Sequence, residues 1–129
     1  DAIFLYNGVT EGVFEKEDPK SDEFWVQSEI LDLLKRKDFG QYGNGNGDMN
    51  LCFLSNNDIT GGNSGSPVFD KNARLIGLAF DGNWEAMSGD IAFEPELQRT
   101  ISVDNRYVLF MIDKWGKCPR LINELKLVK

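Results

Sequence analysis

The order of apolar and polar positions predicts strands in the middle of the chain. Short apolar runs bounded by turn residues are typical of strands, and three of them lie at 51–55, 66–70 and 74–81. The segment DKNA, made of polar or small residues, joins the second run to the third, as in a β-hairpin. Weaker strand signals lie elsewhere: residues 2–6, which the turn pair Asn7-Gly8 follows, 91–94 and 99–103.

The end of the chain has the pattern of helices. Apolar residues recur at helical spacing over 105–115, and Asp104 can cap the first turn. Gly116 is expected to end this helix, and Pro119 suits the first turn of another. A helical tail over about 104–127 therefore follows the strand-rich middle.

Before the middle, a helix is predicted between two loops. Residues 28–37 carry one apolar stripe, with Ser28 as the expected N-cap and basic residues in the last turn. The acidic run over 11–24 is expected to be a solvated loop. The segment 39–50 is rich in glycine and asparagine, which predicts a mobile loop.

Composition limits the class of protein. With 129 residues, 41% of them hydrophobic, the chain suits one compact domain, 1–129, or a piece of one. The net charge of −7 repels phosphate backbones and disfavours nucleic acid as a partner, and no apolar run is long enough to span a bilayer. The start, DAIFLYNG, lacks a signal sequence and an initiator Met, so we expect an excised segment or processing product. Cys52 and Cys118 permit one disulfide and match no metal site.

The segment GGNSGSP, residues 61–67, has the composition of a turn around an activated serine. Glycines allow backbone N–H groups to converge on the oxyanion that forms when a carbonyl is attacked. Gly62 and Ser64 would supply two such N–H groups, with the Ser64 hydroxyl beside them as the nucleophile. The alternative is a glycine-rich turn between strands, in which Ser64 only satisfies a backbone group.

The chain contains no histidine, the usual general base for a serine nucleophile. A lysine can replace histidine only where desolvation removes its proton, and Lys71 lies on a predicted polar turn. We therefore expect the base and its orienting aspartate to come from residues outside this chain. The chain alone is expected to be inactive.

The surroundings of Ser64 resemble the nucleophile segment of trypsin-like serine peptidases. TGGNSGSPVFD followed by LIGLAFD contains the Gly-x-Ser-Gly turn and the strand that flanks the substrate in those enzymes. The resemblance implies a mainly β fold, in which this chain forms one barrel of a double β-barrel and ends in helices. Many such enzymes carry aspartate before the serine, where it pairs with a new amino terminus on activation. Asn63 is neutral, which disfavours that activation.

A more specific resemblance covers the chain from about Gly12 to its end. Residues 75–110, LIGLAFDGNWEAMSGDIAFEPELQRTISVDNRYVLF, together with GGNSGSPV and KRKDFG, resemble the C-terminal part of the bacterial S46 dipeptidyl peptidases of the 7 and 11 types. Members are periplasmic or on the surface of Gram-negative bacteria and remove dipeptides from free amino termini. The resemblance implies a serine hydrolase without metal or organic cofactor, and a homodimer for the intact enzyme.

The same resemblance assigns roles to single residues. Ser64 matches the nucleophile and Gly62 the oxyanion position. Asp81 matches the aspartate that holds the α-ammonium group of the substrate, which is largely cationic at neutral pH because its pKa is about 7.7–8.0. Gly82 matches the position that shapes the pocket for the side chain before the cleaved bond, P1. Arginine there goes with acidic P1 side chains and glycine with bulky apolar ones, so the specificity of the 7 type is expected.

Three alternatives stand beside this interpretation. Asp58 lies six residues before Ser64, the spacing of the aspartate that selects Lys or Arg in trypsin-type enzymes. Asp81 would be an incidental strand-end carboxylate in a general trypsin-like endopeptidase, which would also cleave peptides with blocked amino termini. A catalytically inert, acidic, β-rich binding module would equally lack histidine.

Overall fold

The computed structural model describes residues 3–87 and 96–128. Contacts divide the chain into two compact units. The first comprises Asp1–Gly8 and Leu51–Asn105, and the second comprises Val9–Asn50 and Arg106–Lys129. The first contains the strands and the second most of the helices. Among the described residues, no helix is long and apolar enough to cross a bilayer.

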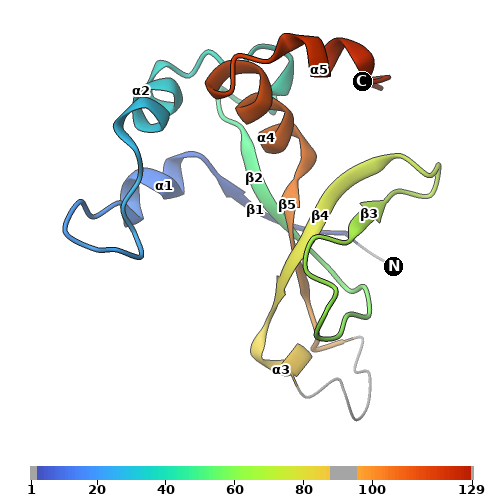
Figure 1. Cartoon of the computed structure of the whole chain (residues 1–129). Helices are drawn as coiled ribbons and strands as arrows, with labels where there is room; N and C mark the ends of the chain where they lie inside the picture. The colour runs from blue at the N-terminus through green and yellow to red at the C-terminus, as the bar shows by residue number, and fades with distance from the viewer. Residues whose placement is uncertain (1–2, 88–95, 129) are drawn as a thin grey trace. The chain divides into compact units, whose positions relative to one another are not determined.

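The first unit is built on a five-stranded sheet with the strand order β1-β2-β5-β4-β3 (Figure 1). The pairs β2–β5, β5–β4 and β4–β3 are antiparallel. The strands are β1 (Ile3–Val9), β2 (Asn50–Ser55), β3 (Pro67–Phe69), β4 (Leu75–Gly82) and β5 (Thr100–Asp104). The sheet confirms the β-rich middle and the β3–β4 hairpin that the sequence predicts. The strand expected at 91–94 lies outside the described residues.

Asn7-Gly8 does not turn the chain, and that prediction is wrong. The first strand runs through both residues to Val9. A Cβ built on Gly8 would lie 2.5 Å from the sulfur of Cys52. Glycine therefore serves close packing between neighbouring strands at this position, a role that a turn-forming pair does not reveal in the sequence.

On one face of the sheet, the ring of Phe53 packs against small residues of the neighbouring strands. Alternate residues of β5 are buried, and Ser102 lies opposite both Phe53 of β2 and Ala79 of β4. A Cβ on Gly77 would lie 2.5 Å from the carbonyl oxygen of Val103 and 2.6 Å from Cε1 of Phe53. The Phe53 ring thus occupies the space that a side chain at position 77 would need, and this packing fixes β4 against its neighbours.

The second unit holds an aromatic and aliphatic core between short helices. They are α1 (Glu11–Lys16), α2 (Ser28–Arg36), η1 (Gly40–Tyr42), α4 (Asn105–Phe110), η2 (Met111–Trp115) and α5 (Pro119–Glu124). Phe110 is buried at the centre, and the rings of Phe39 and Tyr42 meet it edge to face at centroid distances of 5.8 and 6.2 Å. Such pairs add about 0.5–1.5 kcal/mol beyond the area they bury.

The segment 39–50 is mostly a loop, as predicted, but the core of this unit holds it in place, which contradicts the predicted mobility. Phe39, Tyr42 and Met49 are buried in this core. The Tyr42 hydroxyl donates a hydrogen bond to Asp113 Oδ2 at 2.8 Å, and burial, with a smaller contribution from this bond, raises the pKa of the phenol. Glycine and asparagine shape the turns of this segment, while its aromatic residues hold it in place.

The helix boundaries correct two further predictions. Part of the acidic run forms α1, because Val13 and Phe14 pack against the core. The helix α2 begins at Ser28 itself, with Gln27 in the N-cap position and no capping bond from a side chain.

The predicted end of the long helix and the start of the last one are both confirmed. Residues 105–110 form α4 and the next five form a π-helical turn, η2. This turn ends at Gly116, whose N–H donates to the Met111 carbonyl at 2.7 Å. Pro119 opens α5 in the first-turn position that proline favours.

We expect Gly77→Ala to destabilise the protein, because the new methyl group collides with backbone and with Phe53. Overpacking of this kind costs about 1–3 kcal/mol. Gly12→Ala is the matched control, since a Cβ at this helical position meets nothing within 4 Å and alanine favours a helix by up to about 1 kcal/mol. Denaturant unfolding of both variants measures the difference. Equal midpoints for the two would show that the Phe53–Gly77 packing is not as described.

Candidate active site

The loop between β2 and β3 carries the predicted nucleophile on two successive turns. The N–H of Asn63 donates to the Thr60 carbonyl at 3.2 Å, and that of Ser66 donates to the Asn63 carbonyl at 2.9 Å. The third residues of the two turns are Gly62 and Gly65, with φ of 97° and 85°. A positive φ here, with none at the second residue of either turn, indicates type II turns and favours glycine at the third position. The glycine spacing in GGNSG therefore encodes the backbone shape that presents Ser64.

The second turn is fastened to the middle of the sheet. The Gly65 N–H donates to the Ala79 carbonyl at 2.6 Å, and the Ala79 N–H donates to the Ser66 carbonyl at 2.9 Å. Ala79 is buried and lies opposite Ser102 of β5. These two hydrogen bonds place Ser64 beside β4 and couple its position to the packing of the strands.

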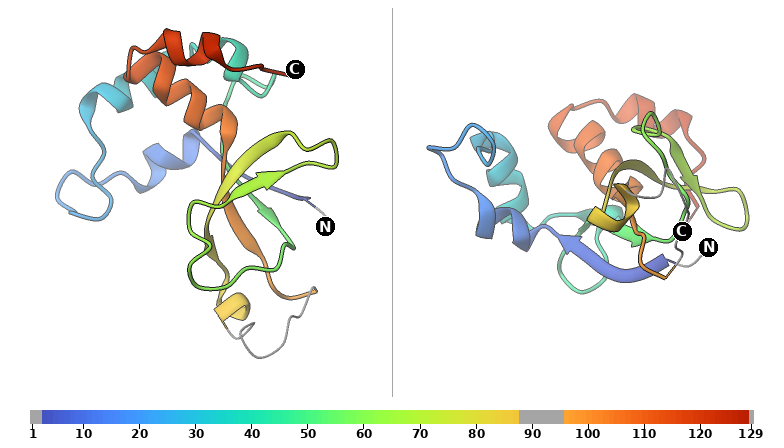
Figure 2. Two further views of the ribbon diagram at one scale, coloured as in Figure 1. Left: turned by 45° about the vertical axis from the view of Figure 1, so that its right-hand side comes forward. Right: turned by 90° about the horizontal axis from the view of Figure 1, so that it is seen from below.

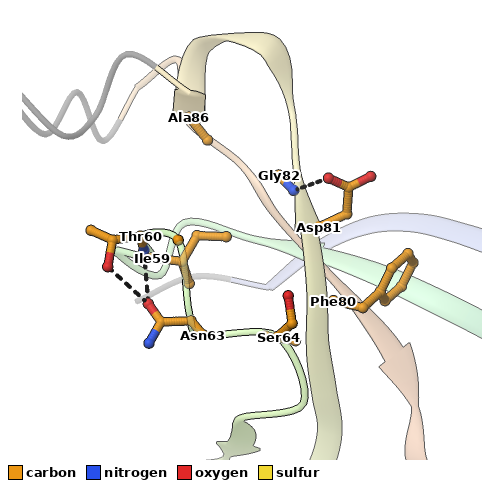
Figure 3. Close-up of a pocket in the computed structure, with 10 residues that line it drawn as sticks. Ile59, Thr60, Asn63, Ser64, Phe80, Asp81, Gly82 and Ala86 are labelled. Atoms are coloured by element: carbon orange, nitrogen blue, oxygen red, sulfur yellow. Dashed lines mark hydrogen bonds between the residues drawn. The ribbon is translucent and has the colours of Figure 1, made fainter.

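A cavity of about 330 Å³ opens between this loop and β4. Ser64, Asp81 and Gly82 all line it, with Ile59 on the loop side and Ala86 on the short helix α3 (Trp84–Met87). Figure 3 shows the Ser64 hydroxyl pointing into the space between Ile59 and β4. Figure 2 shows α3 at the far end of β4, which it follows directly in the chain. The structure therefore brings together the predicted nucleophile and both predicted substrate-binding residues.

Within the described part of the chain, the predicted oxyanion donors are free to donate hydrogen bonds to a ligand. No hydrogen bond among these residues engages the N–H of Gly62, the N–H of Ser64 or the Ser64 hydroxyl. Ser64 is exposed, and a Cβ on Gly62 would meet nothing within 4 Å. Gly62 does not line the cavity itself, but its turn shares Asn63 with the turn that presents Ser64. This arrangement can hold a substrate carbonyl if the two N–H groups converge on one point.

A bulge in β4 sets the direction of Asp81. The register shifts between Ala79 and Asp81, so that Phe80 is the extra residue and Asp81 lies opposite Ile101. Bulges of this kind redirect side chains and are frequent next to active sites. The Asp81 carboxylate is exposed and accepts the N–H of Gly82 at 2.8 Å through Oδ1. Its remaining lone pairs face solvent and can accept a cationic group.

Gly82 lies in an apolar corner of the cavity. A Cβ at this position would lie 2.9 Å from the Ala86 methyl group and 3.4 Å from Cδ1 of Ile59. Lysine and arginine are absent from the residues that line the cavity in the described structure. The corner is thus small and uncharged, which suits an apolar side chain of a ligand.

Asn83 supports the wall of the cavity without lining it, and the sequence did not single it out. Its Oδ1 accepts the N–H groups of Ala86 at 3.1 Å and Arg99 at 2.9 Å, and its Nδ2 donates to the Leu97 carbonyl at 2.8 Å. Asn83 therefore fixes α3 and the entry to β5 with one side chain. Glycine and asparagine are common in turns of any kind, so the pair Gly82-Asn83 indicates a turn but not the contacts of the Asn83 side chain.

Two rival groups lie away from the cavity lining. Asp58 is exposed and does not line the cavity, although its spacing from Ser64 suggested a pocket for basic side chains. Lys71 is exposed in the turn between β3 and β4, where the desolvation that a lysine base requires is absent. Both cysteines are free. In residues 3–87 and 96–128, no group of three or more His, Cys, Asp or Glu side chains is placed to hold a metal ion.

Comparison with known proteins assigns the chain to a family. The family model described as Peptidase S46 matches residues 3–127. The chain belongs to the S46 peptidase family. A dipeptidyl-peptidase 7 from Porphyromonas gingivalis is 73% identical over 98% of the chain, and one from Phocaeicola vulgatus is 57% identical over 98%. An Asp/Glu-specific dipeptidyl-peptidase from Capnocytophaga gingivalis is 54% identical over 92%.

Solved structures of S46 relatives agree with the fold. DPP11 from Porphyromonas endodontalis in complex with the dipeptide Arg-Glu matches 92% of the chain with a TM-score of 0.87 and 47% identity. The complex of that protein with Arg-Asp matches with a TM-score of 0.89 and 46% identity. The chain spans about 17–18% of the length of these relatives. Homologues of this S46 chain are therefore hydrolases that are several times longer.

We expect Asn83→Ala to loosen the wall of the cavity, because it removes both acceptor bonds and the donor bond of the side chain. Amide hydrogen exchange at Arg99 should accelerate by roughly tenfold, the equivalent of about 1.4 kcal/mol. Exchange at Ala86 should change less, because its N–H also donates to the Asn83 carbonyl at 3.0 Å. Asn83→Asp keeps the Oδ1 acceptor and should accelerate exchange less. Unchanged exchange at Arg99 in Asn83→Ala would contradict the role given to this side chain.

Proposed function

We propose that this chain is the nucleophile-bearing part of a serine dipeptidyl peptidase that prefers bulky apolar P1 residues. The observation that carries the proposal is the cavity that Ser64, Asp81 and Gly82 line together, next to two N–H groups without a partner in the described structure. The S46 family membership and the dipeptide complexes of a relative support this reaction class.

The general base comes from residues outside these 129. The chain has no histidine, and Lys71 is exposed outside the cavity. The relatives are several times longer, which leaves room for a histidine and its aspartate elsewhere in them. By resemblance to trypsin-like peptidases, these residues lie on a second β-barrel. The chain alone is therefore inactive, with its nucleophile in place and no group to take up the proton.

The P1 preference follows from the chemistry of the corner around Gly82. An acidic side chain would lose its hydration there and find no cation among the cavity-lining residues, which costs several kcal/mol without a compensating partner. An aliphatic or aromatic side chain gains from burial against Ile59 and Ala86. Sequence identity alone does not decide the P1 preference, because relatives named Asp/Glu-specific are also about half identical to the chain.

Asp81 selects substrates with a free amino terminus. Its exposed carboxylate lies on the rim of the same cavity as Ser64, and the α-ammonium group is a cation that such a carboxylate attracts through a charge-assisted hydrogen bond. By the S46 resemblance, an amino terminus bound at Asp81 would place the bond two residues into the peptide at Ser64. Following the S46 resemblance, the whole enzyme is a homodimer in the periplasm or on the cell surface.

The experiment compares dipeptidyl substrates in the full-length protein that contains this segment. Cleavage after Leu, Met or Phe should exceed cleavage after Asp or Glu by at least tenfold, and acetylation of the substrate amino group should abolish it. Ser64→Ala should remove activity and labelling by a fluorophosphonate probe. Faster cleavage after Asp or Glu would overturn the P1 assignment. Cleavage of acetylated peptides would indicate an endopeptidase. A Ser64 that neither supports cleavage nor reacts with the fluorophosphonate would indicate a binding module.

Gly82→Arg should shift the preference toward acidic P1 residues, because it adds a guanidinium to an apolar corner. The ratio of kcat/KM for a Glu substrate to that for a Leu substrate should rise on the order of tenfold or more. Gly82→Leu is the control of similar bulk without charge, and it should lower both rates without favouring Glu. Adding Ala86→Gly makes room for the arginine stem. An unchanged ratio in the double variant would show that position 82 does not face the P1 side chain.

A further inference from the structure

We propose that Asn63 is the positioning residue of the oxyanion cradle, holding the turn that carries the Gly62 N–H through a neutral side-chain clamp. This inference rests on the proposed function, because the cradle has a purpose only if Ser64 attacks a carbonyl. It assigns to Asn63 the task that an activation ion pair performs where an aspartate precedes the serine.

The clamp is a reciprocal pair of hydrogen bonds between Asn63 and Thr60. The Asn63 N–H donates to the Thr60 carbonyl at 3.2 Å, and the Thr60 N–H donates back to Asn63 Oδ1 at 2.7 Å. The Thr60 hydroxyl approaches the same oxygen at 3.5 Å. Figure 3 shows both side-chain contacts converging on Oδ1, on the loop side of the cavity. The side-chain bond is shorter than the backbone bond that defines the turn, so the side chain contributes substantially to closing it.

The first turn depends on this clamp more than the second turn does. The second turn is fastened to β4 through Gly65, Ser66 and Ala79. The first turn has two glycines at its centre, both exposed, and a Cβ on Gly61 or Gly62 would meet nothing within 4 Å. Glycine loses more backbone entropy on ordering than any other residue. Without packing around Gly61 and Gly62 in the described structure, the bonds to Asn63 hold this turn.

The orientation of one peptide bond decides whether the cradle works. In a type II turn the central peptide, here between Gly61 and Gly62, has the orientation opposite to that in a type I turn. Gly62 can adopt the φ of either form without steric cost, and in the type I form its N–H would point the other way. Holding Thr60 and Asn63 together resists this flip, so the clamp keeps the Gly62 N–H in the orientation of the type II form.

The neutral amide also suits the charge that develops in the reaction. Position 63 lies between the two residues that donate to the oxyanion, and the cavity lining of the described structure offers no lysine or arginine to balance a carboxylate there. A carboxylate at position 63 would oppose the developing negative charge. An asparagine supplies the same acceptor to Thr60 without that opposition, so the cradle needs no activation step to form.

The test uses the full-length protein with three substitutions and a dipeptidyl substrate. Asn63→Ala removes the acceptor, and kcat should fall roughly tenfold to hundredfold with KM within about twofold, since loss of a whole oxyanion donor costs 10²–10³ in kcat. Inactivation by a fluorophosphonate should slow in parallel. Asn72→Ala, in the exposed turn between β3 and β4, is the matched control and should leave kcat unchanged.

Asn63→Asp separates positioning from folding. Aspartate keeps the acceptor for the Thr60 N–H and adds a charge, so its kcat should be reduced at neutral pH. The ratio of its kcat to that of the unsubstituted protein should rise as the pH falls and the carboxyl group becomes protonated. The ratio for Asn63→Ala should not change with pH. A pH-independent ratio for Asn63→Asp, or an Asn63→Ala kcat within twofold of the unsubstituted protein, would overturn this inference and leave the proposed function standing. Absence of turnover dependent on Ser64 in the unsubstituted protein would overturn the proposed function as well.

Discussion

Two backbone hydrogen bonds fasten the loop that carries Ser64 to β4. Gly65 donates to the Ala79 carbonyl at 2.6 Å and Ala79 donates to the Ser66 carbonyl at 2.9 Å. Without them, an exposed loop with three glycines near Ser64 would have no fixed relation to Asp81 or Gly82, which belong to the strand itself. Preorganised geometry of this kind is what a nucleophile and its oxyanion donors require.

The packing of the sheet fixes the strand to which these two hydrogen bonds are made. Ala79 can bind the loop because pairing with β5 fixes the position of its strand. In the same strand, Gly77 leaves room for the ring of Phe53. Beyond the bulge, Asn83 ties α3 and the start of β5 to the end of β4. Backbone and amide contacts thus hold the walls of the cavity, while Ile59 and Ala86 make the corner around Gly82 apolar.

Local chemistry in the sequence was sufficient to predict the serine turn, because glycine spacing determines turn type directly. The strands of the middle and the end of the helix at Gly116 were also predictable from local sequence, namely from apolar runs between turn residues and from the glycine itself. Contacts distant in the sequence were not. Phe39 and Tyr42 order a segment whose composition suggests mobility, and Gly8 packs against Cys52 where its neighbour suggests a turn. The role of Asn83 depends on partners up to sixteen residues away, which no local pattern reveals.

The central claim is that Ser64 attacks a carbonyl whose oxygen is held by Gly62 and Ser64, with the base contributed from outside this chain. A crystal structure of the full-length protein with a dipeptidyl boronate that mimics the tetrahedral intermediate tests it most directly. The account predicts a covalent bond from boron to Ser64 Oγ, a boronate oxygen about 2.7–3.1 Å from both N–H nitrogens, and a histidine from outside these residues next to Oγ. A boronate bound elsewhere, or an oxygen out of reach of the Gly62 N–H, would contradict it.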